Sequence, residues 1–456
     1  MRNRTIVRLA IAAWQPWVLL LLCCVQLNAA AQVSAEDSLG KKRFGRAALL
    51  WSSAQVIPWS YDQYIVNADW AHITLKTLKY NIRPGSWAWD NDGFTTNQFA
   101  HPSHGSVFFN AYRSNGYSFW QSVPAAFAGS YIWEIAGETQ SPSINDFINT
   151  SFGGVVIGET LHRFSNRLID NRSIGFKRQV SEVLALIINP AGGLNRLMDG
   201  KWGKAPANAT HDSTKISAEF DVGIRRFKVN NQDGNFGWYS HVKLVYDTPF
   251  ENYKTAFGYI YLNGEFGKDD STLVNVVSIY GSLAGWRVAL ADSSRHTGLL
   301  TANFDYIDNE AFSYSAESVK FNLFSEFRLP GKFKVHTVLG AGPVILAAVP
   351  DPYFYQGRPY DYCTGIGFNF SGEISFGQRL FYSLSYRGGW LKTLSGNSSE
   401  YFLQALTSEF RYKFAGNFSL CAEPGYFTLK GHYKKEADID KTYPYFRLSV
   451  RYSIPL

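Results

Sequence analysis

The chain has 456 residues, a formal net charge of +7, 16% aromatic residues and only 18% charged residues. This length can hold two or three domains of ordinary size, or one large barrel with an accessory domain. After the first 31 residues, no uninterrupted apolar run approaches the ~20 residues of a membrane-spanning helix. This combination is unusual for a soluble enzyme and favours a transmembrane β-barrel, in which aromatic girdles accompany strands of alternating polarity.

Residues 1–31 have the features of a secretory signal. Three arginines lie within the first eight residues, an apolar run extends from Val18 to Val25, and Ala29-Ala30-Ala31 offers a cleavage site. Removal of three arginines lowers the formal charge from +7 to +4, which argues against a dedicated nucleic-acid binder. We therefore expect export, localisation in the outer membrane and no nucleic-acid partner.

The remaining cysteines and acidic loops give no clear metal signal. Cys363 and Cys421 could form one disulfide in an oxidising envelope, but two cysteines are too few for a framework. No C-x-x-C motif and no His/Cys cluster at zinc spacing exists in the chain. Asp90-Asn91-Asp92 lacks the spacing and closing Glu of a calcium loop. We expect no metal and no cofactor.

Residues 32–96 form a leading segment without a strong period, and a helical domain is predicted for residues 97–200. Helices are expected from Ser103 or His104, over Pro124–Glu138, from Ser141 or Ser143, and over Lys177–Asn189, which Pro190 ends. Small residues such as Gly105 and Gly154 would let neighbouring helices approach closely.

A linker of turn-forming residues, 201–213, separates this domain from residues 214–456, where the polarity period becomes two. The last strand is the clearest: Phe446, Leu448, Val450, Tyr452 and Ile454 alternate with Arg447, Ser449, Arg451 and Ser453. About twelve such runs fit in this region at roughly 20 residues per strand and connection. The predicted fold is α+β, with an N-terminal helical domain followed by an antiparallel transmembrane β-barrel of about twelve strands.

A soluble β-sandwich has the same period and is the alternative. It is disfavoured because charged residues such as Lys320 and Glu326 lie where its core would be. Tyr239, His241, Lys243 and Asp247 are expected on the inward face of one strand, and Arg447 and Arg451 on that of another. Charge networks in the lumen explain these residues without a substrate, and a barrel-borne active site is the other interpretation.

One stretch of the helical region carries a resemblance. It consists of His101-Pro102-Ser103-His104-Gly105-Ser106, Arg113-Ser114-Asn115-Gly116-Tyr117, Gly129-Ser130, Trp133-Glu134, Glu138, Ser143-Ile144-Asn145-Asp146, Gly153-Gly154 and Gly158-Glu159. Over residues 97–163 the chain resembles an uncharacterised bacterial envelope family, domain of unknown function 3943. The resemblance implies location and architecture more than chemistry. A fainter similarity to VanZ-like helical membrane proteins concerns helix packing only.

Polar residues of the same stretch are the candidate site. His101 or His104 could act as general base with Glu134, Glu138 or Asp146 orienting it, and Ser106 or Ser130 could supply a nucleophile. Candidate binding residues are Arg113, Asn145, Glu159 and Arg163, of which Glu159 and Arg163 are four apart and predicted to pair. The alternative is that all of these residues cap turns and form ion pairs inside a helical plug.

Three functions follow from this organisation. The first is an outer-membrane barrel with a helical periplasmic or lumen-plugging domain in a structural or transport role, folded by the barrel-assembly machinery. The second is an envelope lipid-modifying enzyme that acts on phospholipid or lipopolysaccharide through the His/Glu/Asp group. The third is a module that binds an envelope polymer through Trp87, Trp89 and Trp120.

Overall fold

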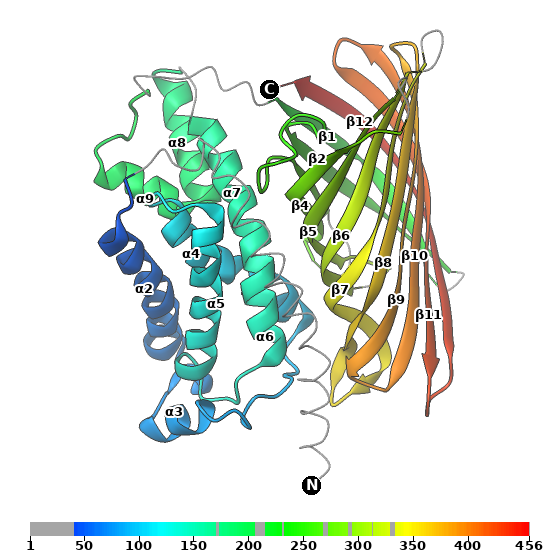
Figure 1. Ribbon diagram of the computed structural model, residues 1–456. Helices are drawn as coiled ribbons and strands as arrows, with labels where there is room; N and C mark the ends of the chain where they lie inside the picture. Colours follow the sequence, from blue (N-terminus) through cyan, green and yellow to red (C-terminus); the bar gives the residue numbers. More distant parts are fainter. Residues whose placement is uncertain are drawn as a thin grey trace. The chain divides into compact units, whose positions relative to one another are not determined.

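The computed structural model describes residues 41–169, 173–205, 215–229, 232–267, 272–290, 294–311, 313–328 and 333–455. The predicted signal, residues 1–31, lies outside these described residues, as does most of the predicted linker. Figure 1 shows helices in the first part of the chain and strands in the second. The predicted α+β organisation, a helical region followed by an antiparallel barrel, is confirmed.

The helical region consists of short helices joined by tight turns. They are α2 (Phe44–Tyr61), α3 (Leu75–Asn81), α4 (His101–Arg113), α5 (Phe119–Ala136), α6 (Ile144–Ile148), α7 (Gly154–Ile169), α8 (Phe176–Ile188) and α9 (Pro190–Met198). Short π-helical turns η2 (Asp62–Val66), η4 (Thr96–Ala100) and η5 (Asn149–Gly153) and the 3-10 turn η3 (Asp69–Ala71) connect them. Among the described residues, no helix combines the length and apolar character needed to span a bilayer.

Local sequence explains where several helices begin. Ser143 caps α6, because its hydroxyl accepts a hydrogen bond from the Asp146 amide at 3.2 Å. Helix α4 begins at His101, earlier than predicted, because η4 leads into it and Pro102 occupies the first turn, where a missing N–H has no consequence. Pro190 ends α8 as predicted but also begins α9, and α2 lies in a segment that showed no clear period.

Close helix contacts depend on glycine. A Cβ added to Gly154 would meet the backbone of Gly105, so α4 and α7 approach backbone to backbone. A Cβ on Gly153 would contact Pro102 at 2.9 Å, and one on Gly158 would contact Phe109 at 2.8 Å. The prediction that these small residues bring helices together is confirmed.

The barrel closes with twelve antiparallel strands, as predicted. The strands are β1 (Ile216–Val229), β2 (Gln232–Tyr246), β3 (Ile260–Gly267), β4 (Val274–Val288), β5 (Ser294–Asp308), β6 (Ser313–Arg328), β7 (Phe333–Tyr355), β8 (Arg358–Phe376), β9 (Leu380–Ser395), β10 (Ser399–Ala415), β11 (Phe418–Tyr433) and β12 (Ile439–Pro455). Each strand pairs with its sequence neighbours, and β1 pairs with β12, so every strand has a partner on both sides.

Ion pairs that join non-neighbouring strands identify the inward face. Arg387 of β9 lies 3.4 Å from Asp305 of β5, and Arg447 of β12 lies 2.7 Å from Glu265 of β3. Such pairs can form only across the lumen, because other strands stand between their members in the barrel wall. The predicted charged lumen is therefore present.

The outward face divides into two zones. Exposed apolar side chains cover β1 and β8–β12, among them Val222, Phe370, Phe402, Leu420 and Val450. On β5 and its neighbours, outward side chains such as Phe304 and Tyr306, which alternate with inward Asp305, are instead fully buried. The sequence pattern is the same in both zones, so the second zone must be covered by another part of the chain.

The helical region provides this cover. Phe119 lies 5.2 Å from Phe257, Phe164 lies 5.9 Å from Tyr246, and Phe94 lies 5.6 Å from Tyr306, measured between ring centroids. Helix α7 contacts β4 and β5, and η5 contacts β6. Because the barrel residues in these contacts face outward, they favour the outer side of the wall over the lumen as the docking site of the helices.

The disulfide that the sequence allowed does not form. Cys363 and Cys421 are both free and buried. The strand register places Cys363 of β8 beside Thr393, Ser399 and Tyr433. Tyr433 ends β11, whereas Cys421 lies near the beginning of that strand, so the two sulfur atoms are far apart along the barrel.

Candidate functional site

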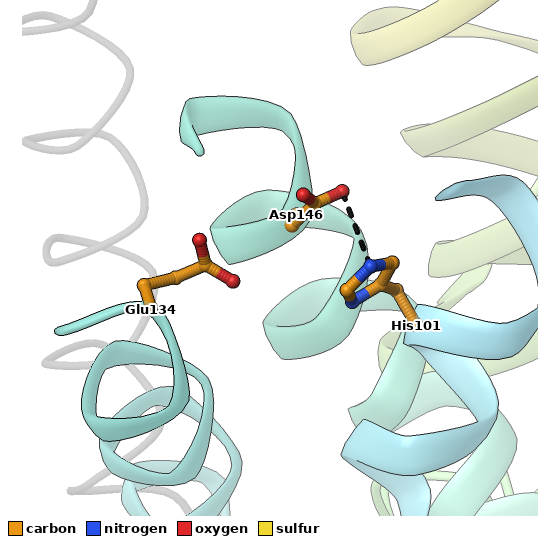
Figure 2. Close-up of side chains that lie close together, drawn as sticks. All are labelled: His101, Glu134 and Asp146. Atoms are coloured by element: carbon orange, nitrogen blue, oxygen red, sulfur yellow. Dashed lines mark ion pairs between the residues drawn. The ribbon is translucent and has the colours of Figure 1, made fainter. Parts of the chain in front are cut away.

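Three of the predicted catalytic side chains converge in the helical region. One ligand-type atom each from His101, Glu134 and Asp146 lies within 4.8 Å of the other two. His101 Nε2 is 3.6 Å from Asp146 Oδ1, and Figure 2 shows the Glu134 carboxylate directed toward this pair. We call these residues the His/Glu/Asp cluster.

Each member comes from a different helix. His101 is the first residue of α4, Glu134 lies in the last turn of α5, and Asp146 lies in the first turn of α6. The Ser143 amide donates a 2.7 Å hydrogen bond to Glu134 Oε2, so the residue that caps α6 also orients the glutamate. The Thr150 hydroxyl lies 3.3 Å from His101 Nδ1, which leaves Nε2 facing the carboxylates.

Asp90 is a site residue that the sequence did not reveal. Its Oδ1 accepts hydrogen bonds from Asn97 Nδ2 at 2.6 Å and from Asn145 Nδ2 at 3.1 Å. Its carboxyl group is also hydrogen-bonded to that of Asp146. The only sequence signal was an acidic pair in an aromatic loop, and no spacing relates Asp90 to the helices.

The barrel helps to fix Asp90. Arg358, at the start of β8, donates a 2.7 Å hydrogen bond from Nη1 to the Asp90 carbonyl and another from Nη2 to the Ser395 carbonyl. Asn97, which binds the Asp90 carboxylate, also donates to the Tyr360 and Tyr362 hydroxyls at 3.0 and 2.9 Å. The wall of the barrel therefore positions one side of the site.

Burial dominates the electrostatics of the cluster. Burial lowers the pKa of His101 to about 4, so the imidazole is neutral at pH 7. Burial, and next the Glu138 carboxyl, raise the pKa of Glu134 well above its usual value. Burial, and next the hydrogen bond with Asp90, raise the pKa of Asp146 in the same way. Burial by itself would also raise the pKa of Asp90. Hydrogen bonds with Asp146 and Asn97 outweigh this effect, and the pKa of Asp90 is lowered.

The site brings several carboxyl groups together, and the structure shows no lysine or arginine paired with Glu134 or Asp146 among the described residues. Two chemical states suit such a site: the carboxyl groups hold protons, or a cation lies between them and the imidazole.

The other predicted catalytic residues lie outside the cluster. His104 Nε2 lies 2.9 Å from the Ala54 carbonyl, and its ring contacts Phe108 and Trp133. Glu138 lies beyond the end of α5 and accepts a 2.7 Å hydrogen bond from Trp133 Nε1. The helix predicted over Pro124–Glu138 therefore ends at Ala136, before Glu138.

Ser106 and Ser130 hydrogen-bond to backbone carbonyls, those of Ser103 and Phe147 respectively. Neither hydroxyl is directed at a base in these contacts. A nucleophilic role for either serine gains no support from this geometry.

The predicted binding residues fall into two groups. Asn145 lies beside the His/Glu/Asp cluster, where its side-chain amide donates hydrogen bonds to Asp90 and Asp146. Glu159 is fully buried and bonds Arg113 Nε at 2.7 Å and Arg163 Nε at 2.8 Å, which confirms the predicted pairing. Burial would raise the pKa of Glu159, but the two guanidinium groups lower it to about 2. This ion-pair network holds α4 to α7.

Residues with other predicted roles are occupied by packing or ion pairs. Trp87 stacks on Tyr131 at 5.9 Å, and Trp89 contacts Tyr362 at 5.1 Å. In the lumen, His241 lies 2.7 Å from Asp221, and Lys243 lies 3.2 Å from Glu219.

The remaining lumen residues follow the same pattern. Arg451 bonds both Asp221 and Glu409, at 2.8 and 2.6 Å, and Arg447 lies 3.0 Å from Glu423. Lumen networks therefore account for these charges. The prediction for Asp247 is wrong, because this residue follows the end of β2 and accepts hydrogen bonds from the Thr248 amide and from Asn252 Nδ2 in the next turn.

Comparison with known families gives one match. Residues 86–191 match DUF3943, a domain of unknown function. The DUF3943 region contains the whole His/Glu/Asp cluster together with Asp90, and the resemblance predicted for this stretch is confirmed. The fainter similarity to VanZ-like proteins is not borne out. Comparison with curated proteins gave no match.

Comparison with solved structures gives distant similarities to outer-membrane proteins. OmpT of Vibrio cholerae is 9% identical, with a TM-score of 0.27 over 54% of this chain and 99% of OmpT. The NanC porin is 9% identical, with a TM-score of 0.29 over 51% of this chain and 98% of NanC. The channel DcaP of Acinetobacter baumannii is 9% identical, with a TM-score of 0.25 over 54% of this chain and 99% of DcaP. Similarities at this level carry no information about what the DUF3943 region does.

Proposed function

We propose that this chain is an outer-membrane protein whose barrel serves as a structural anchor and whose DUF3943 region is the functional part. The observation that carries the proposal is the contrast between the two faces of the barrel. The outward face of β1 and β8–β12 exposes aromatic and aliphatic side chains, as a lipid-facing wall requires. Assembly by the barrel-assembly machinery belongs to this proposal.

The content of the lumen argues for anchoring over transport. One part is filled by an apolar cluster that includes Phe227, Val349 and Tyr445. Ion pairs such as Arg387–Asp305 span another part. A cavity of about 220 Å³ remains beside Lys320, which is smaller than the pockets of ~300 Å³ or more that usually hold small-molecule ligands.

The test is fractionation followed by conductance. The native protein is expected in the outer membrane, with a heat-sensitive barrel on gels, and it should give no stable channels in planar bilayers. Steady conductance from the folded protein would refute the anchor role and support transport. Recovery of a soluble, lipid-free protein would refute the membrane assignment.

A second candidate function is an envelope enzyme that modifies phospholipid or lipopolysaccharide. The specific observation in its favour is the convergence of His101, Glu134 and Asp146 from three helices. The test compares lipid and lipopolysaccharide mass profiles of cells that express the native protein, Glu134→Gln or Asp146→Asn at equal amounts of folded barrel. Glu138→Gln, which alters a nearby half-buried carboxyl outside the cluster, is the control. A lipid species lost in both cluster variants and kept in the control supports an enzyme, and identical profiles refute it.

A further inference from the structure

We infer that the His/Glu/Asp cluster binds a divalent metal ion of the zinc, manganese or iron class through His101 Nε2 and the carboxylates of Glu134 and Asp146. The inference shares its site with the enzyme proposal above. It does not require a reaction, and it departs from the expectation of no metal that the sequence spacing gave.

The first argument is distance. Metal–nitrogen and metal–oxygen bonds of about 2.0–2.2 Å at tetrahedral angles place two ligand atoms of one ion about 3.3–3.6 Å apart. The ligand atoms of the cluster lie within 4.8 Å of one another, and His101 Nε2 and Asp146 Oδ1 are 3.6 Å apart. Side-chain movements of less than about 1 Å therefore bring all three atoms within bonding distance of a common ion.

The second argument is the orientation of the imidazole. The Thr150 hydroxyl lies 3.3 Å from Nδ1, so it can accept the Nδ1 proton and fix the tautomer with the Nε2 lone pair toward the carboxylates. An outer partner of this kind is a usual companion of a metal-binding histidine. Within the described residues Nε2 has no hydrogen bond, and its nearest acidic atom is Asp146 Oδ1.

The third argument is an unused ligand atom. Glu134 is 2% exposed, and its described hydrogen bond, from the Ser143 amide, goes to Oε2. No hydrogen bond to Oε1 is present among the described residues, although Figure 2 shows the carboxylate directed at the other two side chains. Because the Ser143 amide holds Oε2, Oε1 is the oxygen available to a cation, and a cation would offset the cost of burying a charged carboxylate.

The class of metal follows from the donor atoms. One imidazole nitrogen with two carboxylates suits zinc, iron or manganese. Calcium and magnesium prefer ligand shells made only of oxygen. Asp90 shares the side-chain amide of Asn145 with Asp146, at 3.1 and 2.9 Å, and is assigned a positioning role.

The test measures bound metal on the full-length, detergent-solubilised protein. Protein stripped with chelator is titrated with Zn²⁺ against a chromophoric competitor, bound metal is counted by mass spectrometry, and Co²⁺ absorption reports the ligand field. We expect one ion per chain, at least tenfold weaker binding in His101→Gln, Glu134→Gln and Asp146→Asn, and a change in the Co²⁺ spectrum. His104→Gln and Glu138→Gln are matched controls and should bind as the native protein does.

Thr150→Val keeps the inference falsifiable if a ligand variant fails to fold. Loss of the outer partner should weaken binding by about 10–100-fold with the ligands intact. The inference would be overturned if the native protein bound no more Zn²⁺ or Co²⁺ than Asp146→Asn does. It would also be overturned if His104→Gln and Glu138→Gln lost as much metal affinity as the cluster variants. Because the readout is bound metal, failure here is distinguishable from failure of the lipid assay.

Discussion

Replacement of Glu159 by glutamine should strongly destabilise the helical region. The carboxylate is fully buried and holds two guanidinium groups, those of Arg113 and Arg163. A pKa lowered from 4.5 to about 2 corresponds to about 3 kcal/mol of stabilisation at neutral pH. Removal of one partner also leaves buried cations, so Glu159→Gln should cost about 3–5 kcal/mol at pH 7.

The pH dependence follows from the direction of the shift. Because the folded-state pKa is below the unfolded-state value, the stabilisation by Glu159 is complete above pH 4.5 and is lost as the pH falls through about 2. The free-energy difference between native protein and Glu159→Gln should therefore be constant near neutrality and should narrow between pH 4.5 and 2. Other acids affect both proteins equally, so the comparison isolates this residue.

The assay is urea denaturation of the full-length protein, followed by the far-ultraviolet helical signal at several pH values. Glu251→Gln is the control, since its partner Lys215 is 3.5 Å away and both side chains are at least half exposed. Such a pair contributes about 0–1 kcal/mol. Equal stability of Glu159→Gln and native protein at pH 7, or a difference that does not narrow toward pH 2, would refute the reasoning.

Three further substitutions test the contacts around the site. Gly105→Ala should destabilise the helical region by about 1–3 kcal/mol or more in urea denaturation, because the new Cβ would overlap the Thr150 carbonyl. Arg358→Ala should release the Asp90 loop, which loses a charge-assisted hydrogen bond worth about 1.5–3 kcal/mol, and hydrogen exchange of that loop should quicken. Glu317→Leu should stabilise the docked helices by about 1–3 kcal/mol, since both buried carboxylate oxygens lack partners among the described residues, and the melting temperature should rise.

Each of these has a control or a refuting result. Gly85→Ala introduces a Cβ with nothing within 4 Å and should leave stability unchanged. Unchanged exchange in Arg358→Ala would mean that the loop is held without the barrel. Glu317→Gln keeps a polar group between the outward-facing residues Phe304 and Leu346. Its melting temperature should therefore rise less than that of the leucine variant. A lower melting temperature for Glu317→Leu would show that this carboxylate has a stabilising partner.

The alternation of polar and apolar residues was enough to predict the barrel. Arg447 and Arg451 were predicted to face inward because side chains alternate along a strand, and closure of the barrel brings Arg451 into an ion pair with Asp221 of β1. Helix starts were predictable within a few residues where a cap such as Ser143 is present. The pairing of Glu159 with Arg163 was also predictable, because residues four apart share a helix face.

Tertiary structure decided which outward positions face lipid and which face protein. Phe304 and Val450 follow the same alternation, but Phe304 is covered by the helical region and Val450 is exposed. The alternation of polar and apolar residues predicts only that a side chain faces outward. The cover depends on contacts between distant segments, which a local pattern cannot encode.

The candidate site shows the same division. His101, Glu134 and Asp146 could be named from the sequence as candidates, but so could His104 and Glu138, and only the packing of three helices brings the first three together. No sequence pattern related Asp90 to the helices, because the residue that fixes its loop, Arg358, lies 268 positions further along the chain. The sequence by itself determined the element types and the polarity of their faces. The cluster exists only in the folded chain, because its geometry depends on where separate helices and one wall of the barrel meet.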